Sequence, residues 1–216
     1  MTEEQLLQYC FMLEGMTLLQ LAVLTGQTIP KLAIQRKGWA GCLIERFLGA
    51  TAGTQALPDF LELGIELKTI PIGKLGIPLE STYISKISLQ TVYKEHWETS
   101  SCYQKIKKIL WVPIEGECTL SYQARRIGRA FLWSPNASQL MILQQDWYDI
   151  TSMIIIGDIE LLHAGIGQYL HVRPKAANSK SLCYASNAYG EKIHTLPRGF
   201  YLRRAFTKQL YADGII

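Results

Sequence analysis

The stretch PDFLELGIELK, from Pro58 to Lys68, decides the expected fold and the expected site. Glu66 and Lys68 lie two residues apart in a run, 64–70, that alternates apolar and polar side chains, and such alternation predicts a strand. Two such residues share one face of the strand, roughly 6.6 Å apart at a rise of about 3.3 Å per residue. Gly64 predicts a turn just before the strand, so Asp59 is expected to fold back beside Glu66.

Two carboxylates and one ammonium group at a strand edge suit a divalent cation and an attacking water. We therefore expect Asp59, Glu66 and the backbone carbonyl of Leu67 to bind Mg²⁺, with Mn²⁺ as a possible substitute. Lys68 is expected to position or deprotonate the water. By spacing alone, an ordinary solvated ion pair fits Glu66 and Lys68 equally well, so the metal hypothesis depends on the rest of the chain.

The composition is typical of a globular protein with one sizeable core: of 216 residues, 48% are hydrophobic and 19% are charged. No apolar run reaches the roughly 18 residues that suggest a membrane-spanning helix. The N-terminus, residues 1–4, is acidic and lacks the order of a signal peptide, so a cytoplasmic location is expected. The five cysteines are scattered, and no C-x-x-C occurs, which favours reduced thiols over disulfides or zinc.

Positive charge is concentrated in the second half of the chain. Residues 1–100 carry eight Lys and Arg against ten Asp and Glu, whereas residues 101–216 carry fourteen against eight. The segment 173–208 alone has eight basic residues against a single acid, Glu191. A basic cluster of this kind suits a polyanion such as DNA, although a solvated basic face is the ordinary alternative.

The expected elements indicate an α/β fold with a mixed sheet and helices on both sides. Helices are predicted within 2–24, where Thr2 and Thr17 are candidate caps, and at 42–48, 101–109 and 137–156. Strands are predicted at 64–70, 80–87, 109–114, 168–173 and 193–203. The strand 80–87 is expected to pair back against 64–70. Arg173, where the strand 168–173 runs into a loop, is able to donate twice to a guanine edge.

Six blocks, in order along nearly the whole chain, resemble the MutH family of strand-nicking mismatch-repair endonucleases. This family belongs to the restriction-endonuclease-like nucleases with the PD-(D/E)-x-K signature. The matching blocks are Lys37–Gly41, Glu45 with 48–50, Gly64–Pro71, Leu110–Pro113, Arg173–Asn178 and Leu196–Tyr201.

The resemblance implies roles for several residues. Glu45, on the helix before the catalytic strand, would add an acid to the metal site. Lys37 would face the DNA near the cleaved phosphate, and Lys105 matches a basic position linked to cleavage. The remaining DNA contacts would read GATC in the groove, and among them Tyr201 would sense the methyl group on adenine. These contacts are Arg173, Pro174, Lys175, Arg198 and Tyr201.

The resemblance further implies a monomer with a two-lobed fold around a DNA cleft, a catalytic lobe at roughly 1–115 and a recognition lobe at roughly 116–216. The implied reaction is Mg²⁺-dependent nicking of the unmethylated strand at hemimethylated GATC, activated by MutL after MutS finds a mismatch. Two alternatives stay open. One is a GATC-specific restriction endonuclease that cuts both strands, and the other is a non-catalytic DNA-binding protein of the same fold.

Overall fold

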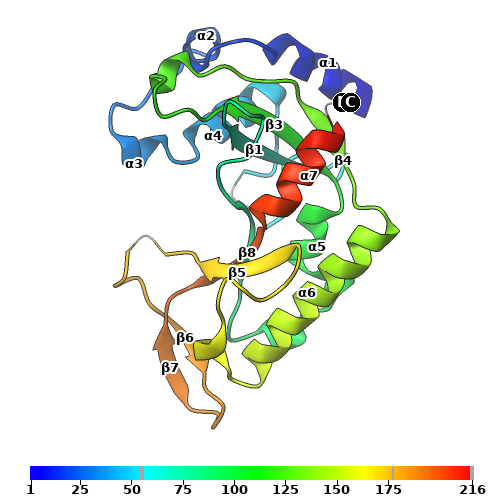
Figure 1. Ribbon diagram of the computed structural model, residues 1–216, viewed down its shortest axis with the longest axis vertical. Helices are drawn as coiled ribbons and strands as arrows, with labels where there is room; N and C mark the ends of the chain where they lie inside the picture. Colours follow the sequence, from blue (N-terminus) through cyan, green and yellow to red (C-terminus); the bar gives the residue numbers. More distant parts are fainter. Residues whose placement is uncertain (54–55, 177, 215–216) are drawn as a thin grey trace. The chain divides into compact units, whose positions relative to one another are not determined.

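The computed structural model describes residues 1–53, 56–176 and 178–214 (Figure 1). The chain divides into two compact units, each formed by segments that are far apart in the sequence. The first unit comprises Met1–Glu80, Lys107–Ser134 and Lys208–Ile216, and the second comprises Ser81–Ile106 and Pro135–Thr207. The described part of the chain contains no helix long and apolar enough to cross a membrane.

The first unit is built on a mixed three-stranded sheet in the order β1-β3-β4. Strand β1 (Glu66–Ile72) pairs in parallel with β3 (Ile109–Glu115), and β4 (Phe131–Trp133) pairs antiparallel with β3. β1 is therefore an edge strand, which leaves one side of its backbone open to other partners.

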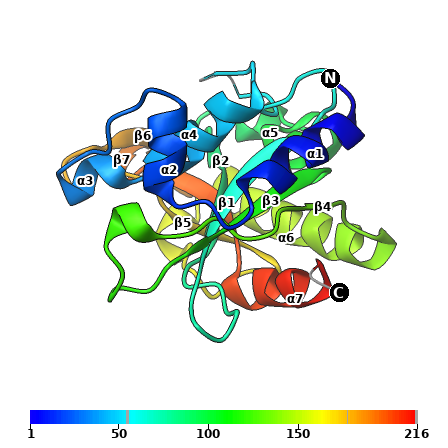
Figure 2. The same cartoon turned by 90° about the horizontal axis from the view of Figure 1, so that it is seen from above.

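Helices gather on one side of β1 and β3 (Figure 2). They are α1 (Glu3–Leu13), α2 (Leu18–Leu24) and α4 (Trp39–Leu48), with the short α3 (Ala33–Arg36) before α4. As expected, Thr2 and Thr17 cap α1 and α2, each within a capping box that includes the glutamine three residues later. Apolar side chains of these helices pack on Leu67 and on Leu110 and Val112 of β3, and this packing forms a continuous core.

The second unit contains an antiparallel sheet in the order β2-β8-β5 and a hairpin of β6 and β7. Its strands are β2 (Thr82–Ile87), β5 (Leu170–Pro174), β6 (Cys183–Ser186), β7 (Lys192–Thr195) and β8 (Arg198–Leu202). Its helices include α5 (Ser101–Ile106) and the long α6 (Ala137–Ile155), which Asn136 caps. Short 3-10 turns lie at Val92–Lys94, Trp97–Thr99 and Ile159–Leu161, and another, Tyr122–Ala124, lies in the first unit. The last helix, α7 (Arg204–Gly214), runs from the end of the second unit into the final segment of the first.

The α/β class is confirmed, but the predicted pairing of the strand 80–87 with 64–70 is wrong. β2 pairs with β8, and the Gly- and Pro-rich segment after β1 folds back only on the last residues of β1. In that segment, the N–H of Gly73 donates to Ile77 and the N–H of Leu79 donates to Pro71. The strand after this segment pairs with β8, and the partner of β1 is the later strand β3, which contributes to the same apolar core as β1.

Segments of the two units alternate along the chain, whereas a single boundary near residue 115 was predicted from the sequence. Strand β3 pairs with β1 and strand β4 pairs with β3, so residues 107–134 belong with the unit that carries Asp59 and Glu66. β2 binds to β8, which places residues 81–106 with the unit that carries Arg173. Strand pairing, and not position in the sequence, decides which unit each segment joins.

Candidate active site

The side chains of Glu66 and Lys68 lie on one face of β1, as the alternation of the strand requires. Lys68 Nζ is 2.5 Å from Glu66 Oε1. The Glu66 side chain is only 1% exposed, and that of Lys68 is 16% exposed. An ion pair at this depth is screened by water much less than a surface pair, so the two groups hold each other in a defined position at the strand.

Asp59 reaches the open edge of β1 from the preceding turn. Its Oδ2 accepts a hydrogen bond of 2.8 Å from the backbone N–H of Leu67. The N–H of Glu66 instead donates to Lys108, at the start of the neighbouring strand β3. Because the N–H and C=O of one strand residue point to the same side, the carbonyl of Leu67 faces the edge where Asp59 lies. An Asp carboxylate and a backbone carbonyl, both oxygen donors, therefore meet at this edge.

Glu45 extends from α4 toward the same strand. A methyl group placed on Gly41 would lie 3.7 Å both from Glu45 Oε1 and from the hydroxyl of Thr69 on β1. The pKa of the exposed Cys42 thiol is raised by partial burial and then by the charges of Glu45 and Asp59. Both carboxylates therefore lie near this thiol, a neighbour that the sequence analysis treated only as a reduced cysteine.

The structure thus brings the predicted catalytic residues together in pairs. Asp59 binds the backbone of Leu67, Glu66 binds Lys68, and Glu45 faces β1 beside Thr69. Among the described residues, however, no three His, Cys, Asp or Glu side chains come close enough to hold a metal ion as a group. The assignment of the acids as metal ligands stays a prediction.

The predicted DNA contacts at Lys37 and Lys105 lie in different units. Lys37 is exposed in the first unit, directly after α3 and directly before the left-handed Gly38 that precedes α4. Lys105 is half-buried in the last turn of α5, in the second unit. Only Lys37 therefore belongs to the unit that holds Asp59, Glu66 and Lys68.

The other predicted DNA contacts come together in the second unit, on the paired strands β5 and β8. Arg173 is opposite Gly199, and Pro174 is opposite Arg198. The guanidinium of Arg173 lies 5.9 Å from the centre of the Tyr201 ring. Strand pairing thus assembles in one place residues that are more than twenty positions apart in the sequence.

Tyr83 on β2 completes this group. Its ring lies 5.3 Å from that of Tyr201, edge to face, and the ammonium group of Lys175 lies 4.0 Å from its centre. Gly199 makes room for the rings, because a side chain there would approach Tyr83 within 2.9 Å. We call these residues the aromatic and basic cluster; it comprises Tyr83, Arg173, Lys175, Arg198 and Tyr201.

Asp146 on α6 supports this cluster and was not singled out from the sequence, which predicted only the helix at 137–156. Its side chain is buried, and its two oxygens accept hydrogen bonds of 2.7, 2.7 and 2.8 Å from the N–H groups of Gln168, Tyr169 and Leu170. These N–H groups lead into β5. A single acid in an otherwise apolar helix stripe was the only signal available in the sequence.

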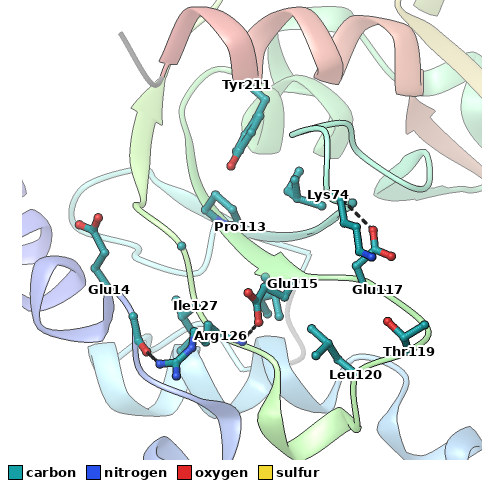
Figure 3. A pocket seen from close by; sticks show the side chains of 15 residues that line it. Glu14, Lys74, Pro113, Glu115, Glu117, Thr119, Leu120, Arg126, Ile127 and Tyr211 are labelled. Atoms are coloured by element: carbon teal, nitrogen blue, oxygen red, sulfur yellow. Dashed lines mark hydrogen bonds between the residues drawn. The ribbon is translucent and has the colours of Figure 1, made fainter.

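A large hollow of the first unit contains none of the predicted site residues. It measures about 650 Å³ and lies at the carboxyl ends of β1 and β3, beside Tyr211 (Figure 3). Several of its charged side chains bind neighbouring backbone: Glu117 accepts from the N–H of Lys74, and Glu115 accepts from the N–H of Arg126. Its volume is that of a ligand pocket, but we place the chemistry at β1 because the paired acid and lysine lie there.

A mixed sheet whose edge strand carries an acid and a lysine two residues apart, with a second acid folded against it, defines the restriction-endonuclease-like class. Sequence comparison agrees with this class. A family described as "DNA mismatch repair enzyme MutH" matches residues 48–146. Proteins named "DNA mismatch repair protein MutH" from Escherichia coli O127:H6 and Escherichia coli O81 are each 47% identical over 211 residues, covering 98% of this chain and 92% of theirs. The chain belongs to the MutH family of DNA mismatch repair enzymes.

Proposed function

We propose that this protein is a Mg²⁺-dependent endonuclease that nicks the unmethylated strand of DNA at hemimethylated GATC sites. The observation that carries the proposal is the pairing of buried Glu66 with Lys68 on β1, next to the edge where Asp59 meets the Leu67 backbone. Family membership supports the same reaction. The activators expected from the resemblance, MutL and indirectly MutS, and the monomeric and cytoplasmic state belong to this proposal.

The oxygen donors at β1 suit Mg²⁺, which prefers carboxylate and carbonyl ligands. Asp59, Glu66 and the Leu67 carbonyl would hold the ion, with Glu45 as an additional acid from α4. When bound, the ion would polarise the scissile phosphate and offset the charge on the leaving oxygen.

Lys68 is the residue proposed to orient the attacking water or, as a neutral amine, to take its proton. Its ammonium group is fixed against Glu66 Oε1, so it is held at the strand before substrate arrives. Such a fixed group loses little freedom in reaching the reactive geometry. A positioned acid or base typically contributes about 10²- to 10⁴-fold to the rate.

Sequence recognition is assigned to the aromatic and basic cluster of the second unit. Arg173 is exposed at the end of β5, where its guanidinium is able to bind O6 and N7 of guanine. Tyr201 is held against Tyr83 and faces the Arg173 guanidinium. A ring so fixed against the N6 group of adenine would leave little room for a methyl group, which explains a preference for the unmethylated strand.

The test is a nicking assay on plasmids with unmethylated, hemimethylated and fully methylated GATC, in Mg²⁺. We expect Lys68→Ala to lower the nicking rate by about 10²- to 10⁴-fold and Asp59→Ala to lower it at least as much. The matched controls Lys74→Ala and Glu62→Ala change exposed residues of the same unit and should nick at the wild-type rate. Wild-type nicking by either site variant would refute the assignment.

The products distinguish the alternatives. Accumulation of nicked circles that stop at one strand supports strand-specific nicking, whereas direct conversion to linear DNA indicates a restriction endonuclease. Binding to GATC duplexes without any cleavage in Mg²⁺ or Mn²⁺ would indicate a non-catalytic protein of the same fold.

A further inference from the structure

Three cationic side chains surround an open pocket in the first unit. None of the residues proposed to bind the metal or to read bases lines this pocket, although Lys37, which is expected near the cleaved phosphate, does. The pocket measures about 500 Å³, and its lining includes Arg36, Lys37, Ser121, Tyr122 and Arg125. Within the part of the chain that the structure describes, no carboxylate lies within ion-pair distance of Arg36, Lys37 or Arg125. Like charges gathered without a counter-ion repel one another, so the pocket favours an anion.

Tyr122 holds the two arginines in place. The guanidinium of Arg36 lies 5.3 Å from the centre of its ring, and that of Arg125 lies 5.6 Å from it. The hydroxyl of Tyr122 donates to the backbone carbonyl of Arg36 at 3.2 Å. Guanidinium groups fixed in this way are already ordered, and less entropy is lost when they bind a ligand.

Much of the hydrogen-bonding capacity of the arginines remains available. Arg36 donates through Nε to Pro30 and through Nη2 to Lys31, which leaves its Nη1 group. Arg125 makes one long bond of 3.4 Å to the carbonyl of Glu117, and its buried Nε has no partner among the described residues. A guanidinium presents five N–H donors in a geometry that matches phosphate oxygens.

We propose that Arg36, Lys37 and Arg125 form a binding site for a backbone phosphate of DNA. This inference rests on the proposed function, since the family resemblance implies that Lys37 faces the DNA near the cleaved phosphate, and Lys37 directly follows Arg36. The pocket would add Arg36 and Arg125 to the phosphate contact expected of Lys37. It contributes affinity and position but reads no base, because phosphate contacts carry no sequence information.

The experiment measures binding of a fluorescent hemimethylated GATC duplex over a series of KCl concentrations, with Ca²⁺ in place of Mg²⁺ to prevent cleavage. Losing one phosphate contact should reduce the slope of log K against log salt by about 0.9. We expect this reduction for Arg125→Gln, but not for Arg125→Lys, which keeps the charge. Lys74→Gln is the matched control, because it removes one exposed positive charge elsewhere in the same unit. Melting temperatures establish that each variant is folded.

A second measurement uses Cys118, an exposed thiol that lines the pocket. Bound DNA should slow its alkylation in the wild-type protein, as followed by peptide mass spectrometry. An unchanged salt slope in Arg125→Gln, or an equal loss in Lys74→Gln, overturns the proposal. Inorganic phosphate could also stabilise the wild type but not Arg125→Gln while the salt slope of DNA binding is the same in both proteins. That result would assign the pocket to a free anion and would also overturn the proposal. If the wild type itself fails to bind DNA, the proposed function falls.

Discussion

Replacing Asp146 by alanine should loosen the start of β5 and, with it, the aromatic and basic cluster. Asp146 accepts three backbone hydrogen bonds of 2.7–2.8 Å from successive N–H groups, those of Gln168, Tyr169 and Leu170. The residue is only 4% exposed, so bulk water does not reach these donors in the folded protein. Alanine would leave these donors without their acceptor.

The magnitude follows from the number of donors. A buried donor without a partner costs about 1–3 kcal/mol. Three such donors would together cost about 3–9 kcal/mol. Because the chain would relax and admit water to some of them, we expect a total loss of about 3 kcal/mol, at the lower end of that range. For proteins of this size, 1 kcal/mol corresponds to about 2–4 °C in melting temperature, so Asp146→Ala should melt about 6–12 °C lower.

Thermal and denaturant unfolding of the purified variants would measure this loss. The matched control is Asp149→Ala, an exposed acid on the same helix whose carboxylate accepts from Gln145; it should change stability by at most about 0.5 kcal/mol. Asp146→Asn keeps one acceptor oxygen and should fall between the two. We also expect Asp146→Ala to bind GATC duplexes more weakly, because β5 carries Arg173. If Asp146→Ala and Asp149→Ala melt at the same temperature, the reasoning is refuted.

Two further predictions follow from the pKa shifts. The charge of Glu45, after partial burial, helps to raise the pKa of Cys42. Glu45→Gln should therefore increase the thiolate fraction and speed alkylation of Cys42 by iodoacetamide at fixed pH, whereas Glu62→Gln should not. Equal alkylation rates in the two variants would contradict the placement of Glu45 near this thiol. Burial, with the charges of Arg203 and Arg173, lowers the pKa of His171, so below about pH 6.5 the unfolded chain takes up a proton more readily than the folded chain and stability falls. The melting temperature of His171→Gln should therefore fall less than that of the wild type between about pH 7.5 and pH 5.5. Equal falls in the two proteins would show that this histidine does not contribute to the pH dependence of stability.

Local structure could be predicted from the sequence because it depends on residues only a few positions apart. The caps at Thr2 and Thr17 bind groups three residues on, and the shared face of Glu66 and Lys68 follows from the period of a strand. Helix α6 was expected at 137–156 and is found at Ala137–Ile155 for the same reason. Asp59 was likewise placed beside β1 by a turn of a few residues.

The partners of the strands were decided only by the tertiary structure. β1 pairs with a strand about forty residues later, and β2 pairs with one more than a hundred residues later. Many strands of similar pattern compete for such pairings, and the outcome depends on which arrangement buries the apolar faces of the whole chain. The same holds for Asp146, whose three donors lie more than twenty residues away, and for Tyr83, which joins Tyr201 only because β2 lies against β8.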